Sequence, residues 1–167
     1  MADNSTRTRA KHPRAALAGP YGHPFHPILV TIPIGTWTAS IIFDIIGLLA
    51  EDPTPYALAA QILIAIGIIG AVVAAVWGLM DLSQLAAGTK ARRTALIHMT
   101  ANLAAVVVFA ISWAVRAAEG HDEVSVLGFI LSLVGLTIVG FSGWLGGKLS
   151  YRYGVRVADE QTQNEGF

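Results

Sequence analysis

Four long stretches of apolar residues constrain the fold of this chain more than any other feature of its sequence. They cover residues 28–50, 56–80, 94–115 and 124–147, and crossing a bilayer takes about 20 apolar residues. Only 13% of the residues are charged, whereas soluble domains carry about a quarter. The helices of a soluble bundle would also show charged faces, which these stretches lack. The sequence therefore predicts an all-α integral membrane protein, a four-helix transmembrane bundle with helices at about residues 27–50, 56–80, 93–117 and 124–148.

The segments on either side of these stretches are polar. Residues 1–20 are basic and rich in small side chains, so we expect a disordered tail there. Residues 158–167 form a second polar tail, which leaves residues 21–157 as the membrane domain. The first apolar stretch is too long for the core of a cleavable signal peptide, so none is expected. The absence of cysteine excludes disulfides, thiolate metal sites and iron–sulfur ligation.

The basic residues predict the orientation of the bundle. Ten of the eleven Lys and Arg residues lie before the first helix, between the second and third, or after the fourth. The other two loops are acidic, with Arg116 as their only basic neighbour. Because short cytoplasmic loops carry the excess of basic residues, we expect a multi-pass protein of the inner membrane with both termini in the cytoplasm. The basic rim suits anionic lipid headgroups, and nothing in it resembles a nucleic-acid groove.

The first helix begins with an unusual motif, "HPFHPILVTIP" at residues 23–33. Pro27 suits the first turn of a helix, where its missing N–H costs nothing, and this makes His26 a cap residue. Pro33 lies farther in and cannot donate to the carbonyl of Leu29, so the helix should be interrupted there. In a membrane such a break is tolerated only where protein or water satisfies the freed group.

Several polar side chains fall inside the apolar stretches at helical spacing. Ionisable groups in a membrane are costly and face the bundle interior, so we expect an inner-side cluster with further polar groups above it. The cluster comprises His26, Asp81, Arg93, His98 and Asn102, with Thr94 on the same helix face and Thr36, Ser40 and Asp44 farther toward the outer side. Each residue also has a structural interpretation: His26 as a cap, His98 as a helix–helix hydrogen bond, and Asp81 with Arg93 as an ion pair at the rim.

Small and aromatic residues in the stretches predict packing. Glycines recur at spacings of three and four in the second and fourth helices, which lets helix backbones approach closely in lipid. Gly70 and Gly135 are therefore expected at helix–helix contacts. The tryptophans, Trp37 among them, are expected mostly in the interfacial belts near helix ends.

Motifs along most of the chain resemble a known family. The strings "HPILVTIPIG" (26–35), "WGLMD" (77–81), "RRTALIHMTAN" (92–102) and "GGKLSYRYGVRV" (146–157) are similar to those of bacterial four-helix predicted membrane proteins of unknown function, the domain of unknown function 2231 family. The resemblance implies a four-helix membrane fold and carries over His26, Asp44, Asp81, His98 and Asn102. Some relatives resemble fusions with Rieske-type or cytochrome c domains, which implies redox partners, although these 167 residues show no such domain.

Two functions of different class follow. The first is a non-catalytic membrane subunit or scaffold, acting with partner proteins or as a homo-oligomer, because no nucleophile–base set indicates a stand-alone enzyme. The alternative is an electron-transfer subunit linked to a b-type haem or a quinone, with His26 and His98 as haem ligands. In that case Gly78 would make room for the ring, and the propionates would meet Arg92, Arg93 or Lys148. A reduced-minus-oxidised absorbance spectrum distinguishes the two.

Overall fold

The structure, a computed structural model, describes residues 4–167 and contains the predicted helical bundle. Within these residues, four helical segments are long and apolar enough to span a membrane. They are α2 (His26–Leu29) with α3 (Thr31–Leu49), α4 (Thr54–Leu82), α5 (Lys90–Glu119), and α6 (Val126–Gly147) with the π-helical turn η2 (Lys148–Arg152). The helices begin and end within a few residues of the expected bounds; α4 and α5 are longer than expected at both ends, and η2 continues the last helical segment to Arg152.

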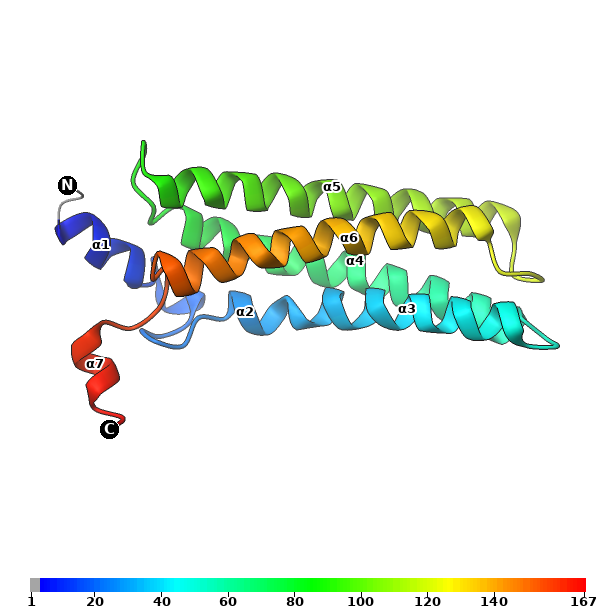
Figure 1. Cartoon of the computed structure of the whole chain (residues 1–167), viewed down its shortest axis with the longest axis horizontal. Coiled ribbons are helices and arrows are strands. Elements are labelled where there is room, and N and C mark those ends of the chain that lie inside the picture. The colour runs from blue at the N-terminus through cyan, green and yellow to red at the C-terminus, as the bar shows by residue number, and fades with distance from the viewer. Residues whose placement is uncertain (1–3) are drawn as a thin grey trace.

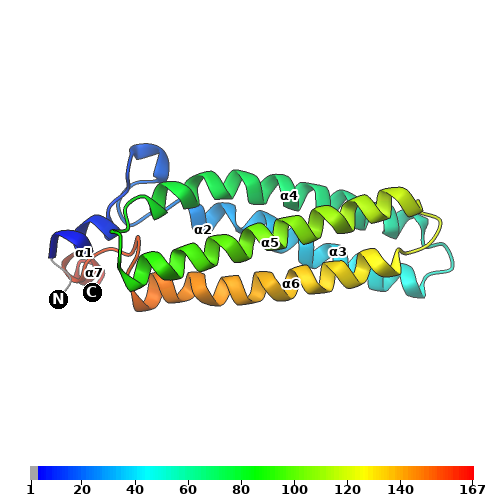
Figure 2. The same cartoon turned by 90° about the horizontal axis from the view of Figure 1, so that it is seen from above.

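The four long helices form two hairpins, α3–α4 and α5–α6, that lie side by side (Figures 1 and 2). Helices α3 and α5 run in one direction, and α4 and α6 run in the other. Because α3 and α5 each contact α4 and α6, α3 and α5 stand diagonally opposite each other. Both chain termini lie at one end of the bundle, together with the α4–α5 turn. We call it the basic end, and we call the end with the α3–α4 and α5–α6 turns the acidic end.

Local sequence explains where the helices begin, break and end. The hydroxyl of Thr89 accepts from the backbone N–H of Arg92 at the start of α5, and Ser125 caps α6 in the same way. Helix α5 ends at Gly120, whose φ of 85° suits a residue without a side chain. The interruption predicted from Pro33 is confirmed, since α2 ends at Leu29 and α3 begins two residues later.

The centre of the bundle is a pair of stacked aromatic rings. Trp37 of α3 and Phe109 of α5 lie 4.1 Å apart at an interplanar angle of 9°. A side chain at Gly67 of α4 would meet the Trp37 ring, and one at Gly135 of α6 would meet the Phe109 ring. The expectation that Trp37 lies in an interfacial belt was wrong, because it is 3% exposed and donates to the carbonyl of Ile64.

The glycine packing prediction is confirmed. A Cβ at Gly135 would lie 2.7 Å from the Phe109 ring, and one at Gly70 would lie 2.7 Å from the Ile32 side chain. Such distances are too short for any side chain, so both glycines allow neighbouring helices to touch. By contrast, a Cβ at Gly140 on the outer face of α6 would meet nothing within 4 Å.

The two terminal segments cover the basic end. The first described residues, where we expected a disordered tail, form the helix α1 (Asn4–Lys11), followed by the 3₁₀ turn η1 (Ala16–Ala18); the C-terminal segment ends in α7 (Glu160–Asn164). The backbone N–H of Arg156 donates to the carbonyl of Ala10, and the ammonium group of Lys11 donates to that of Val157. A small apolar core of Leu85, Ala95 and Val155 lies beneath this cover.

Candidate functional site

Two histidines face each other across the bundle near its basic end. His26 lies in α2 and His98 in α5, and their ring centroids are 6.5 Å apart with the rings nearly perpendicular. His26 Nδ1 lies 2.9 Å from the carbonyl oxygen of Ala74, and His98 Nδ1 lies 2.8 Å from both the carbonyl oxygen and the hydroxyl of Ser142. The Ser142 hydroxyl in turn donates to the carbonyl of His98. Since a carbonyl only accepts, both Nδ1 atoms carry the proton. Both rings therefore present an unprotonated Nε2 in their neutral form.

Each imidazole rests against a glycine of the neighbouring helix. A Cβ at Gly78 would lie 3.1 Å from Cε1 of His26, and one at Gly146 would lie 3.4 Å from Cε1 of His98. A larger side chain at either position would push the ring toward the centre of the bundle. The glycines and the Nδ1 hydrogen bonds together fix the position and the rotation of both rings.

The two Nε2 atoms differ in their partners. The side-chain amide of Asn102 donates to His98 Nε2 at 3.0 Å, one turn along α5. Among residues 4–167, no side chain or backbone group is recorded as a hydrogen-bond partner of His26 Nε2. His26 is only partly buried, and its Nε2 is not among the buried atoms recorded without a partner, so the site is distinguished by an accessible acceptor on a ring that is otherwise held in place.

Asp81 does not join this cluster as predicted. Its partner is Arg156, with 2.9 Å between Arg156 Nε and a carboxylate oxygen, and not Arg93, which is exposed. Arg156 follows η2, where the chain turns back under the bundle, and its φ of 61° is rare for a residue with a side chain. Its guanidinium also donates to the carbonyls of Ala18 and Gly19. The prediction failed because it considered only the short α4–α5 loop and not the returning C-terminal segment.

Two other predicted residues, Thr36 and Ser40, serve their own helix, and a third, Thr94, is buried. Thr36 donates to the carbonyl of Ile32, and Ser40 donates to that of Trp37, one turn back along α3. Thr94 is 7% exposed near the start of α5. These contacts satisfy polar groups within packed helices and provide no ligand atom to the histidine pair.

Asp44 lies at the acidic end, in a separate buried cluster. Its two carboxylate oxygens each accept from Arg116 at 2.7 Å, and the two side chains are 0% and 2% exposed. Arg116 Nε also donates to the hydroxyl of Ser112, and Nη2 donates to that of Ser132. The sequence indicates Arg116 only as the basic neighbour of the acidic outer loops, and does not predict this role. Its position in the series Phe109, Ser112, Arg116, at spacings of three and four, could have placed it on the buried face of α5.

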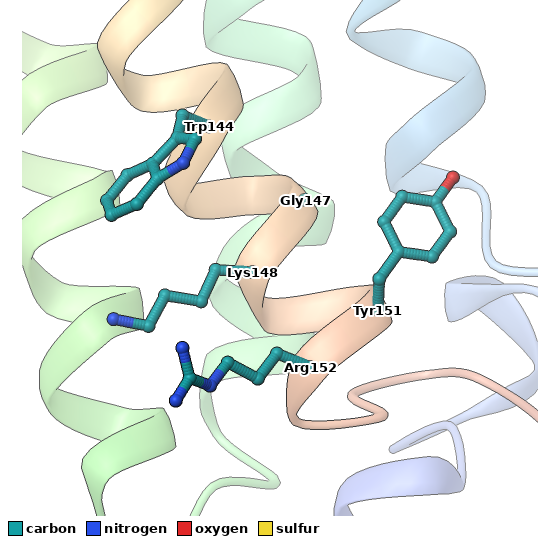
Figure 3. A pocket seen from close by; sticks show the side chains of 5 residues that line it. All are labelled: Trp144, Gly147, Lys148, Tyr151 and Arg152. Atoms are coloured by element: carbon teal, nitrogen blue, oxygen red, sulfur yellow. The ribbon is translucent and has the colours of Figure 1, made fainter.

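A shallow surface pocket at the basic end lies apart from the histidine pair. It is lined by Trp144, Gly147, Lys148, Tyr151 and Arg152 around the turn η2 (Figure 3). The ammonium group of Lys148 lies 5.4 Å from the centre of the Trp144 ring, which fits a cation–π contact. These exposed aromatic and basic side chains suit the membrane interface.

The comparisons with known proteins agree with the architecture. The model of a family described as predicted membrane proteins, DUF2231, matches residues 22–159. The match includes α2 through η2 and therefore both histidines. No curated protein and no solved structure matches the chain.

Proposed function

The chain belongs to the DUF2231 family of predicted membrane proteins, and we propose that it acts as a small membrane subunit whose functional site is the histidine pair at the basic end. The observation that supports this most is the open Nε2 of His26, a partly exposed residue whose ring is held by Ala74 and Gly78. A fixed, neutral imidazole is suited to bind a metal centre or to accept a hydrogen bond from a ligand.

A second candidate is electron transfer through a b-type haem held by His26 and His98. The ring separation favours it, because two axial imidazoles at about 2 Å from one iron place their centroids about 6 Å apart. The packing opposes it, because Gly78 and Gly146 already accommodate the imidazoles. A porphyrin would require α4 and α6 to move apart. The guanidinium of Arg92, one of the expected propionate partners, donates to the carbonyl of Leu85.

A quinone fits the pair less well than a haem. Only the reduced form, a quinol, could donate to both unprotonated Nε2 atoms, and it would hold them about 10 Å apart, since each hydrogen bond adds nearly 3 Å to the width of the ring. The observed separation of 6.5 Å between the ring centroids is much shorter. The spacing therefore favours a single atom between the rings over a second ring.

The orientation proposed for this subunit has both termini in the cytoplasm. The basic residues gather at the end of the bundle that carries both termini, as the positive-inside rule requires. A reporter that is active only in the cytoplasm, fused after Phe167, should be active in cells, and a periplasmic reporter at the same position should be silent. The opposite pattern would overturn the orientation.

The test of the functional proposal is the content of the purified full-length protein. We expect a bound metal or haem, or a co-purifying partner protein, that depends on both histidines. It should be lost in His26→Ala and in His98→Ala but retained in His12→Ala, a control in the tail whose ring stacks on Tyr21. Absorbance spectra would detect a haem, elemental analysis a metal, and mass spectrometry a partner. Identical contents in all four proteins would contradict the proposal.

A further inference from the structure

The two hairpins of the bundle repeat each other residue by residue at the positions that meet in its interior. On the first helix of each hairpin the equivalent residues are 72 positions apart: His26 and His98, Trp37 and Phe109, Ser40 and Ser112, Asp44 and Arg116. On the second helix they are 68 positions apart: Gly67 and Gly135, Ala74 and Ser142, Gly78 and Gly146. The residue types alone form a weak signal of a repeat, because some equivalent residues are identical and others differ.

The contacts make the repeat clear. His26 Nδ1 hydrogen-bonds the carbonyl of Ala74, and His98 Nδ1 hydrogen-bonds that of Ser142, at equivalent positions. The same two rings touch equivalent glycines through the same atom, Cε1. In the middle of the bundle, the Trp37 and Phe109 rings likewise face the equivalent glycines of α4 and α6. Each of these contacts in one hairpin therefore has a counterpart in the other.

The direction of the helices defines the symmetry. Because α3 and α5 run the same way, the hairpins are related by an approximate two-fold rotation about the long axis of the bundle, the arrangement of parallel repeats in membrane proteins. Equivalent residues on diagonally opposite helices meet on this axis. They are the histidine pair, the Trp37–Phe109 stack, and the Asp44–Arg116 ion pair.

We propose that His26 and His98 are the equivalent ligands of a single copper(I) ion, bound on this axis between their Nε2 atoms. The inference rests on the proposed function and names its ligand. Two imidazoles in line with one ion, at metal–nitrogen distances of about 2.0 Å, place their ring centroids about 6 Å apart, close to the 6.5 Å observed. Donation of the other ring N–H to a backbone carbonyl, as both rings do here, is the usual arrangement for a metal-binding histidine.

The surroundings of the histidine pair favour an ion with a single charge and few ligands. Among residues 4–167, no group of three or more His, Cys, Asp or Glu residues is placed to hold a metal ion. These residues therefore provide no site for a metal that needs four protein ligands. Asp44 and Asp81 are each paired with an arginine, so neither is available to neutralise a divalent ion. Removing an ion from water costs about four times more for two charges than for one. Copper(I) carries one charge, accepts two ligands in line, and binds imidazole.

Copper binding would replace one hydrogen bond. The Asn102 amide donates to His98 Nε2, and the ion requires the same lone pair. The Asn102→Ala variant should therefore bind copper(I) at least as tightly as the unaltered protein. If Asn102 were itself a ligand, the same variant would bind copper(I) more weakly. This variant distinguishes two-coordinate binding by the histidines from a site that includes the amide.

The experiment titrates full-length protein in detergent with copper(I) under reducing conditions, against a chromophoric copper(I) chelator. We expect one ion per chain and a loss of affinity of at least about 100-fold in His26→Ala and in His98→Ala, with His12→Ala unchanged. X-ray absorption of the loaded protein should show two nitrogen neighbours. Parallel titrations with zinc(II) should show weaker binding.

The outcomes separate this inference from the proposed function. Tighter binding of zinc(II), equal binding in both histidine variants, or four neighbours around copper would overturn the copper site. A haem that depends on both histidines would overturn copper while leaving the functional proposal intact. If neither copper nor haem nor a partner protein depended on the two residues, both proposals would fail.

Discussion

The two ends of the pseudo-two-fold axis carry polar pairs of opposite design. At the acidic end, Asp44 and Arg116 occupy equivalent positions with opposite charges, and every donor and acceptor recorded there is used in a compact network with Ser112 and Ser132. At the basic end, the equivalent positions carry the same residue, histidine. Their Nδ1 atoms are satisfied by backbone carbonyls, but His26 Nε2 has no recorded partner within residues 4–167.

The comparison separates a structural pair from a binding pair. Complementary charges on the axis can satisfy each other, so the acidic-end pair is closed to an outside ligand. Two neutral Nδ1–H imidazoles cannot satisfy each other, because each Nε2 only accepts. A symmetric pair of acceptors is suited to an electron-poor partner on the axis. The variants below should show whether the two ends differ in this way.

The largest effect is expected at the acidic end. Arg116→Ala leaves the Asp44 carboxylate buried without its partner, and such changes cost about 3–5 kcal/mol. We expect a large loss of thermal stability in detergent, if the variant folds at all. The charge swap Asp44→Arg with Arg116→Asp is the matched control, because the two positions are equivalent about the axis. It should recover much of the loss, and failure of the swap to recover any stability would contradict the symmetric arrangement.

The next effect concerns the glycines between the two helices of each hairpin. Gly135→Leu and Gly70→Leu place a large side chain against Phe109 and Ile32, where even a Cβ comes within 2.7 Å. Overpacking typically costs about 1–3 kcal/mol and sometimes more. Thermal unfolding should show lower stability for both variants. Gly140→Leu, on an open face of α6, serves as the control and should be nearly neutral; equal losses in all three would refute the packing model.

A smaller effect on stability is expected at the basic end. His98→Ala removes the hydrogen bonds with Ser142 and Asn102, and each neutral hydrogen bond contributes about 0.5–1.5 kcal/mol. His26→Ala removes one such bond and should cost less. Both variants should fold and retain most of the stability of the bundle while losing the bound group. Unfolding as severe as that of Arg116→Ala would identify the histidine pair as structural.

The smallest effect lies outside the membrane segments. The exposed carboxylate of Asp159 accepts from the backbone N–H of Thr162 and from the hydroxyl of Tyr21, and these hydrogen bonds, with the backbone bond foremost, lower its pKa below the usual value. Because the folded pKa is lowered, the contribution of these contacts is present above the ordinary aspartate pKa and is lost as the pH falls through the lowered value. NMR signals of Thr162 and Tyr21 should change at acidic pH together, without unfolding of the bundle. Asp159→Asn should remove this pH dependence.

The sequence predicted the four-helix fold well because the length of an apolar stretch is a local property. The four helices, the break before Pro33 and the packing of Gly70 and Gly135 all follow from neighbouring residues in the chain. The placement of His98 opposite the start of the first helix was also correct, because residues at the same depth in a small bundle have few possible neighbours.

The partners of the buried charges could not be predicted in the same way. Asp44 and Arg116 are 72 residues apart, and Asp81 and Arg156 are 75 residues apart. Which pairs form depends on how the hairpins pack and on how the chain returns under the basic end. The internal repeat was also missed, because equivalent residues make the same contacts but often differ in type, as Trp37 and Phe109 show.

The central claim is that both histidines present an unprotonated Nε2 toward the axis, and NMR of the full-length protein labelled with ¹⁵N at histidine tests it most directly. His26→Ala and His98→Ala would assign the two signals. The account predicts that both rings are neutral near pH 7, with the proton on Nδ1, and that both Nε2 signals shift together when copper(I) is added at one equivalent. A proton on Nε2 of His26, or copper-induced shifts at only one of the two rings, would contradict it.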